Sequence, residues 1–250
     1  MTVKHLLTHT MGIGHKSMLK STGGYENIQN YILHIPSDVP IGSEVNYSCP
    51  GYILLGRILE KVFSERLDRL FTELVANPLG MKYTSYHPDK RLDIVNSNSS
   101  AEELGLVNDY NCRFLGGICG NAGLFSCVRD IMQYVNLLLS YGESLFSKDI
   151  FLDAIKNHTS GMAEDRGLGF VYVGDKYERT GSLFPSGSFG HNGHTGQSVF
   201  VDPGSGLYSI ILSDARICAE QNLIGGKCDP VEKMHHDIYA AIKRDMELLI

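Results

Sequence analysis

The sequence predicts an α/β fold of the α+β type, in which a helical lobe comes first and an antiparallel sheet covered by a C-terminal helix comes second. Apolar residues recur at helical spacing within residues 1–165, whereas 166–250 hold short β-prone runs separated by glycine and then an amphipathic tail. The chain has 250 residues, 43% of them hydrophobic, which is enough to bury a substantial core. We therefore expect one domain with two closely packed lobes.

The helical lobe shows its clearest periodicity over residues 51–74, where apolar side chains recur at steps of three and four. We expect two helices here, broken near Ser64, and an end at residues 77–80 (NPLG), because proline disfavours helix in its predecessor and glycine permits a turn. Another helix is predicted from Val128 to Leu139, with Ser126 as its N-cap.

The second part predicts a β-meander. The expected strands are Gly169–Val173, Ser188–His191, Gln197–Asp202 and Tyr208–Ser213. The proline and glycines of residues 202–206 suit a tight reversal, so the last two strands should pair directly. Residues 229–249 predict an amphipathic helix over the sheet. The other face would need more chain to cover it, which suggests that an N-terminal segment is missing.

Composition excludes several classes of protein. Acidic residues outnumber basic ones, 28 to 22, and no run of Lys and Arg exceeds two residues, so we expect no nucleic-acid partner. The apolar runs are far shorter than the roughly 20 residues of a membrane span, and the first residues do not resemble a secretory signal. The six cysteines form no C-x-x-C pair. We expect mostly reduced, buried thiols, with one or two disulfides still possible, and the compartment stays open.

Four stretches gather most of the polar residues that could perform chemistry. They are Thr2–Gly12 (TVKHLLTHTMG), Asn46–Gly56 (NYSCPGYILLG), Leu115–Ser126 (LGGICGNAGLFS) with Asn108-Asp109 before it, and Phe189–Pro203 (FGHNGHTGQSVFVDP). His5 and His9 could be a metal pair, but no glutamate follows His5 as in H-E-x-x-H. His191 and His194 stand three apart on a predicted strand and should point to opposite sides. We therefore expect no metal site.

In this order the stretches resemble the "HLLTHTSG", "YSN-x-GY-x-x-LG", "HDENA…GGVAGHAGLFSTADD" and "FGHTG-x-TG-S-x-x-x-DP" stretches of the penicillin-recognising serine hydrolases. That family comprises class C β-lactamases, penicillin-binding proteins and related esterases. The resemblance covers nearly the whole chain and implies a β-lactamase/transpeptidase-like fold. It also implies acyl transfer on a D-Ala-D-Ala-like peptide, a β-lactam or an ester, without a cofactor.

The resemblance assigns roles to particular residues. Tyr47 would be the phenolate base, which requires neighbouring cations to lower its pKa. His191 stands in the Lys-Thr-Gly box with Asn192 and Gly193, where it would face the substrate. Gly193 would allow substrate to approach the strand closely, and the N–H of His194 on the edge strand would donate to the oxyanion.

Two further positions concern the substrate side of the site. The glycine-rich Leu115–Ser126 loop suits a backbone that passes close to a ligand, with Asn121 as a candidate substrate contact, although it could equally be a tight loop beneath the cleft. Cys49 replaces the family's usual asparagine and removes an amide that would contact substrate.

The nucleophile is the missing part of the resemblance. The family attacks with the serine of a Ser-x-x-Lys helix that should precede the first stretch, and here that stretch begins at residue 2. The string Ser17–Lys20 follows it instead, among polar residues, and we interpret it as an exposed loop. The sequence therefore predicts an N-terminally truncated chain that is inactive alone. The alternatives are a non-catalytic module that binds peptidoglycan-like peptides or a partner protein, and complementation by another chain.

Overall fold

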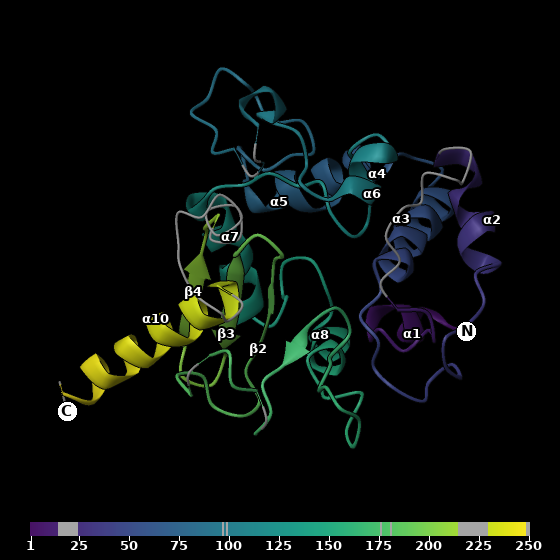
Figure 1. The fold of residues 1–250 in the computed structure, drawn as a ribbon. Coiled ribbons are helices and arrows are strands. Elements are labelled where there is room, and N and C mark those ends of the chain that lie inside the picture. The colour runs from purple at the N-terminus through teal and green to yellow at the C-terminus, as the bar shows by residue number, and fades with distance from the viewer. Residues whose placement is uncertain are drawn as a thin grey trace. The chain divides into compact units, whose positions relative to one another are not determined.

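The computed structural model describes residues 1–14, 25–96, 98, 100–175, 177–180, 182–214 and 230–248 (Figure 1). The chain forms two compact units. Unit 1 comprises Met1–Gln133 and Asn157–Gly169, and unit 2 comprises Tyr134–Lys156 and Phe170–Ile250. This division differs from a single boundary at residue 165, because residues 134–156 pack with the sheet. Within unit 2, for example, the Phe151 ring lies edge-on against Phe189, with centroids 5.9 Å apart.

Unit 1 is helical and has its own core. Its helices are α1 (Val3–Leu7), α2 (Ile28–Leu33), α3 (Cys49–Phe63), α4 (Leu67–Phe71), α5 (Asn77–Leu79) and α6 (Tyr110–Phe114), with short helical turns at Tyr25–Asn27, Thr72–Ala76 and Ala101–Glu103. The core is made by the apolar faces of α1, α2, α3 and α6 together with neighbouring loop residues. Its most buried members include Leu6, Ile28, Ile32, Ile53 and Cys112.

Local signals set the ends of these helices. Ser64 adopts a left-handed conformation (φ 54°) and ends α3 where the sequence predicted a break. Gly80 closes α5 in the same way (φ 68°). Helix α7 spans Val128–Leu139 as predicted, but Ser126 is not its N-cap. The first helical N–H groups bond to the carbonyl of Cys127, while the Ser126 hydroxyl lies 2.7 Å from the Thr84 hydroxyl.

Unit 2 is built on the predicted meander. Strands β1 (Val171–Tyr172), β2 (Phe189–Asn192), β3 (Ser198–Asp202) and β4 (Leu207–Ile211) pair antiparallel in chain order. Asp202 organises the last reversal, since its carboxylate accepts the N–H groups of Gly204 (3.0 Å) and Ser205 (3.2 Å). The β3–β4 pairing is thus encoded in the turn itself.

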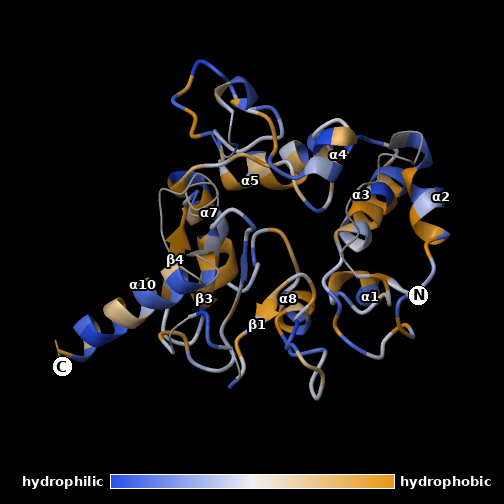
Figure 2. Cartoon of the chain, viewed as in Figure 1, coloured by the Kyte–Doolittle hydropathy of each residue, from blue (hydrophilic) through white to orange (hydrophobic). Residues whose placement is uncertain are grey.

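Two further helices belong to unit 2, α8 (Lys148–Ala154) and α10 (Pro230–Glu247). Helix α10 covers the sheet as predicted: Tyr239 is fully buried and its hydroxyl lies 2.9 Å from that of Ser198. His235 Nε2 lies 2.9 Å from the carbonyl oxygen of Gly196. Figure 2 shows mainly hydrophobic residues along β3 and β4 and an alternation of hydrophilic and hydrophobic residues along α10. Within the described part of the chain, no helix is both long and apolar enough to cross a membrane.

Candidate functional site

His9 fixes the position of the second sequence motif in unit 1. It follows α1 in a left-handed conformation (φ 57°) and is almost fully buried. Its carbonyl oxygen accepts the N–H of Asn46 (2.8 Å), and its Nδ1 accepts the N–H of Ser48 (3.0 Å). The two backbone groups on either side of Tyr47 are therefore held by one residue of the first motif.

The His9 ring also contacts two tyrosines. The ring centroids of Tyr47 and Tyr52 lie 4.5 Å and 4.9 Å from that of His9. The Tyr52 hydroxyl donates to the carbonyl oxygen of Leu7 (2.9 Å). His5 has a different partner, the N–H of Thr2 (3.0 Å), so the two histidines of the first motif do not form one site.

Ser48 has a structural role as the N-cap of α3. Its Oγ accepts the N–H of Gly51 (3.2 Å) and lies 3.3 Å from Met11 Sδ. The residue has no exposed surface. Tyr47, in contrast, keeps 44% of its surface exposed. The motif therefore presents the tyrosine and buries the serine.

The third motif, Leu115–Ser126, meets the second one at Asn121. The Asn121 side chain hydrogen-bonds the Cys49 thiol, and its Nδ2 donates to Asp109 Oδ1 (3.3 Å). Asp109 is held in turn as the N-cap of α6, where it accepts the N–H of Cys112 (2.7 Å). The Asn121 Oδ1 is buried and has no hydrogen-bond partner in the described structure. An amide acceptor is thus available beside Tyr47-Ser48-Cys49.

A close contact between backbones places this loop. A Cβ added to Gly120 would lie 2.1 Å from the carbonyl oxygen of Tyr52 and 3.0 Å from the N of Gly56, both in α3. The glycine is needed for packing against α3. The first alternative, a backbone that passes close to a ligand, is not needed to explain it. This contact supports the second alternative, in which Leu115–Ser126 is a tight loop beneath the cleft.

Burial dominates the electrostatics around Tyr47. Desolvation raises the pKa of the Tyr47 phenol above its ordinary value; Cys49 and Asp109 add to the rise, and Arg166 opposes it. Burial, followed by Asp109, raises the pKa of Cys49 to about 11. Among the described groups, the positive charge of Arg166 does not outweigh burial, so the pKa of Tyr47 is not lowered in the way that the role of phenolate base requires. The sequence motifs do not identify Arg166, because this residue lies outside all four of them.

The fourth motif, Phe189–Pro203, lies in unit 2. His191 Nδ1 lies 2.9 Å from the carbonyl oxygen of Asn192, and the Asn192 Nδ2 donates to the Tyr177 hydroxyl (2.5 Å). The Gly193 N–H donates to the carbonyl of Gln197 (2.7 Å), and a Cβ on Gly193 would lie 2.6 Å from Gln197 Oε1. Gly193 thus lies against the Gln197 side chain within the hairpin.

Some predictions about site residues need correction or lie outside the described chain. The N–H of His194 was expected on an edge strand, but β2 ends at Asn192 and the Gly193–Gln197 hydrogen bond turns the chain there. His194 is exposed in that turn. Ser17–Lys20 lies outside the described residues. Tyr47 and Asn121 come together in unit 1, whereas the His191–His194 segment belongs to unit 2.

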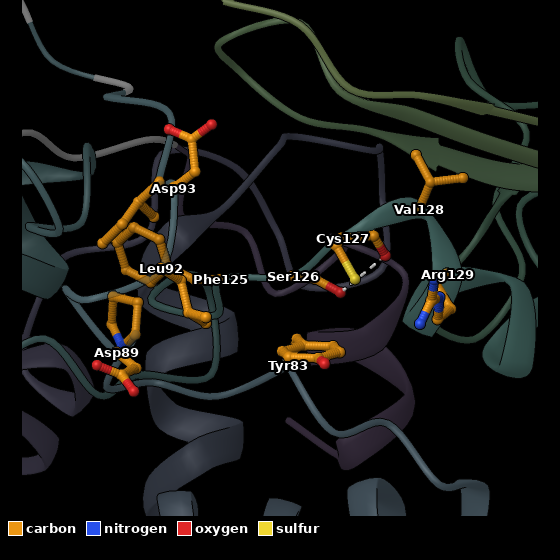
Figure 3. Close-up of a pocket in the computed structure, with 11 residues that line it drawn as sticks. Tyr83, Asp89, Leu92, Asp93, Phe125, Ser126, Cys127, Val128 and Arg129 are labelled. Carbon is orange, nitrogen blue, oxygen red and sulfur yellow. Dashed lines mark hydrogen bonds between the residues drawn. The ribbon is translucent and has the colours of Figure 1, made fainter.

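Unit 1 also contains a hollow of about 590 Å³ (Figure 3). Tyr83, Leu92, Phe125, Cys127 and Arg129 are among its lining residues. The described lining includes neither Tyr47 nor Asn121. Cys127 carries a partly exposed thiol, whereas the thiols of Cys49, Cys112 and Cys119 are buried and form no disulfide in the described structure.

Comparison with known proteins identifies the family. The β-lactamase family model matches residues 1–217. A protein of Escherichia coli O157:H7 named "Putative D-alanyl-D-alanine carboxypeptidase" is 30% identical over 212 residues, which are 73% of this chain and 48% of that protein. The N-acetylmuramyl-L-alanine amidase of Bacillus subtilis (strain 168) is 27% identical over 217 residues, 74% of this chain and 48% of the amidase. The chain thus spans about half the length of these curated relatives.

Solved structures share the fold. A β-lactamase from Mycobacterium bovis aligns with a TM-score of 0.65 at 21% identity, over 98% of this chain and 74% of that one. With the family match and the mixed helical and antiparallel architecture, this likeness establishes a β-lactamase/transpeptidase-like fold. The chain therefore belongs to the β-lactamase family, the penicillin-recognising serine hydrolases.

Proposed function

We propose that this chain carries the proton-transfer and substrate-binding part of an acyl-transfer site for a D-Ala-D-Ala-like peptide, a β-lactam or an ester. The observation that carries the proposal is that Tyr47 stands just before α3 while Asn121 hydrogen-bonds Cys49 at the first position of that helix. The names of the relatives, a carboxypeptidase and an amidase, support acyl chemistry on peptides of the bacterial cell wall.

Tyr47 is the proposed proton carrier. Its raised pKa keeps the phenol protonated at neutral pH, so it can donate the Oη proton to a leaving nitrogen or oxygen. Water adds to the acyl carbon before the bond to the leaving group breaks, and the proton that this water loses returns to the phenolate. Exposure of 44% of the residue leaves the ring accessible to a substrate.

Asn121 is the proposed substrate contact. Its unpartnered Oδ1 can accept the N–H of a peptide bond or of a β-lactam side-chain amide. Because its side chain hydrogen-bonds Cys49, the carboxamide stands beside the position where related proteins carry asparagine. Asn121 can thus supply the amide that Cys49 lacks. Independently of these residues of unit 1, we propose that His191, Asn192, Gly193 and the N–H of His194 in unit 2 contact substrate.

The serine beside Tyr47 cannot be the nucleophile in this arrangement. Ser48 has no exposed surface, and its Oγ accepts the N–H of Gly51. We propose that the chain by itself binds substrate without forming an acyl-enzyme. Cys49 in place of asparagine and the protonated Tyr47 favour a second candidate, a non-catalytic module that binds peptidoglycan-like peptides.

Two measurements test the proposal. The purified chain is titrated with N-acyl-D-alanyl-D-alanine by calorimetry, and Asn121→Ala is compared with Asn30→Ala, an exposed asparagine on α2. Loss of one hydrogen bond, worth about 1 kcal/mol, should weaken binding roughly fivefold in Asn121→Ala. Asn30→Ala should bind the dipeptide as tightly as the parent. Equal affinities would remove Asn121 from the site, and absence of any binding would refute the substrate class.

The second measurement is the intact mass after incubation with a penicillin or a fluorophosphonate. An unchanged mass is expected, and an adduct would contradict the proposal that the chain by itself forms no acyl-enzyme. Hydrolysis of a chromogenic cephalosporin or ester then separates the two candidates. Turnover that is lost in Tyr47→Phe favours the enzyme, whereas dipeptide binding without turnover favours the binding module.

A further inference from the structure

Two buried cysteines of unit 1 hydrogen-bond each other. Cys112 lies on α6, and Cys119 follows seven positions later in the Leu115–Ser126 loop. Both belong to the apolar core of unit 1, where Cys112 has no exposed surface and Cys119 keeps 3%. The Cys112 sulfur is hydrogen-bonded to the side chain and to the backbone N–H of Cys119. The two thiols are therefore in contact, which is the arrangement that a disulfide requires.

The backbone between the two cysteines folds back on α6. The Gly117 N–H donates to the carbonyl oxygen of Cys112 (2.8 Å), and the Gly116 N–H donates to that of Arg113 (3.1 Å). Gly116 and Gly117 have positive φ values of 94° and 85°, a conformation that glycine adopts without strain. This reversal returns Cys119 to the helix that carries Cys112.

We propose that Cys112 and Cys119 are a redox modification site, at which hydrogen peroxide converts the two thiols into a disulfide that shifts the loop carrying Asn121. In the first step the Cys119 thiolate attacks one oxygen of the peroxide, the O–O bond breaks, and hydroxide leaves and takes up a proton to become water. Cys119 is then a sulfenic acid.

Cys112 completes the reaction. It attacks the sulfenic sulfur of Cys119, the S–S bond forms, the S–O bond breaks, and the second hydroxide leaves as water with the proton of Cys112. Two electrons have then passed from the two thiols to one peroxide. Because the two sulfurs are already in contact, this second attack is intramolecular and needs no further reagent.

The surroundings of Cys112 set this order of attack. The hydrogen bond with Cys119, burial and the charge of Asp109 raise the pKa of the Cys112 thiol above its ordinary value. A raised pKa suppresses the thiolate, which is the nucleophilic form. Cys112 also has no exposed surface that a peroxide could reach. Cys119 is therefore the thiol that reacts with the peroxide.

The disulfide would change the loop that carries Asn121. The Cys112 thiol donates to the carbonyl oxygen of Ala122 (3.2 Å), and oxidation removes this donor. Oxidation also draws the two sulfurs from hydrogen-bonding distance to about 2.05 Å. Gly120 already lies against α3, so the loop has no slack between Cys119 and Asn121. If the proposed function holds, oxidation should therefore weaken binding of N-acyl-D-alanyl-D-alanine several-fold.

The test treats the folded chain with hydrogen peroxide at pH 8 and removes the excess with catalase. The remaining thiols are alkylated with iodoacetamide in urea, and the peptides are mapped with and without dithiothreitol. We expect a peptide pair joined through Cys112 and Cys119 that dithiothreitol separates. The matched control is Cys127→Ser, which removes a partly exposed thiol of the same unit and should leave this cross-link intact.

Two further readouts separate the site from its effect. In Cys112→Ser the sulfenic acid of Cys119 has no partner and should be trapped by dimedone, whereas in Cys127→Ser it should not accumulate. If Cys112 and Cys119 are both alkylated after peroxide, or are joined to other cysteines, the inference is overturned.

Calorimetry then compares dipeptide binding by the oxidised chain and by the same sample after reduction. Equal affinities of the two forms would refute the effect on Asn121. If neither form binds the dipeptide, the proposed function fails, whereas the peptide map still decides whether the disulfide forms.

Discussion

Substitution of Gly120 by alanine tests how the third motif, Leu115–Ser126, is placed on α3. The new Cβ would lie 2.1 Å from the carbonyl oxygen of Tyr52, whereas ordinary contacts of a Cβ begin near 3.4 Å. The neighbouring atom belongs to helical backbone, so the loop must yield by roughly 1 Å. Overpacking of this kind costs about 1–3 kcal/mol, and we expect the upper end of that range.

Displacement of the loop should also affect the site. Asn121 follows Gly120 directly and would move away from Cys49, and a shift of about 1 Å at a binding group can cause large losses of function. We therefore expect Gly120→Ala to lower the midpoint of urea unfolding and to weaken binding of N-acyl-D-alanyl-D-alanine. Circular dichroism and calorimetry measure the two effects.

Gly80→Ala is the matched control. Gly80 has a positive φ (68°), and a Cβ there would have no neighbour within 4 Å. Its substitution should cost only the left-handed strain, about 1 kcal/mol, and leave dipeptide affinity unchanged. If Gly120→Ala and Gly80→Ala have the same unfolding midpoint and the same affinity, the packing of this loop on α3 does not control the site.

Two other perturbations address the same region. His9→Ala should lower the free energy of unfolding by about 2 kcal/mol, because the buried N–H of Ser48 loses its acceptor; a urea midpoint equal to that of the parent would contradict this. Cys49 should resist iodoacetamide at pH 8 while Cys127 reacts, and peptide mapping that finds Cys49 labelled first would count against its burial. The pKa of Cys49 in the folded protein is about 11, above the usual thiol value. The stability that its protonated thiol contributes is therefore complete below pH 8 and should fall as the pH rises toward 11. Free energies of unfolding that change in parallel with pH in the parent and in Cys49→Ser would refute this.

Elements governed by local chemistry were predicted well. The break of the helix at Ser64 and the stop at Gly80 follow from conformations that those few residues favour. The turn at Asp202 closes through its own carboxylate. The Ser126 cap was wrong because its hydroxyl bonds to Thr84, which is 42 positions away in the sequence. A propensity rule cannot weigh such a competing partner.

For the site, the sequence by itself determined the family, the order of the motifs and the identity of Tyr47 and Asn121 as candidates. Tertiary structure decided what these residues meet. It placed Asn121 at Cys49, made Gly120 a packing residue, brought the charge of Arg166 to Tyr47 and raised the pKa of the phenol. These properties depend on burial and on contacts between distant parts of the chain, and neither is encoded in the spacing of a motif.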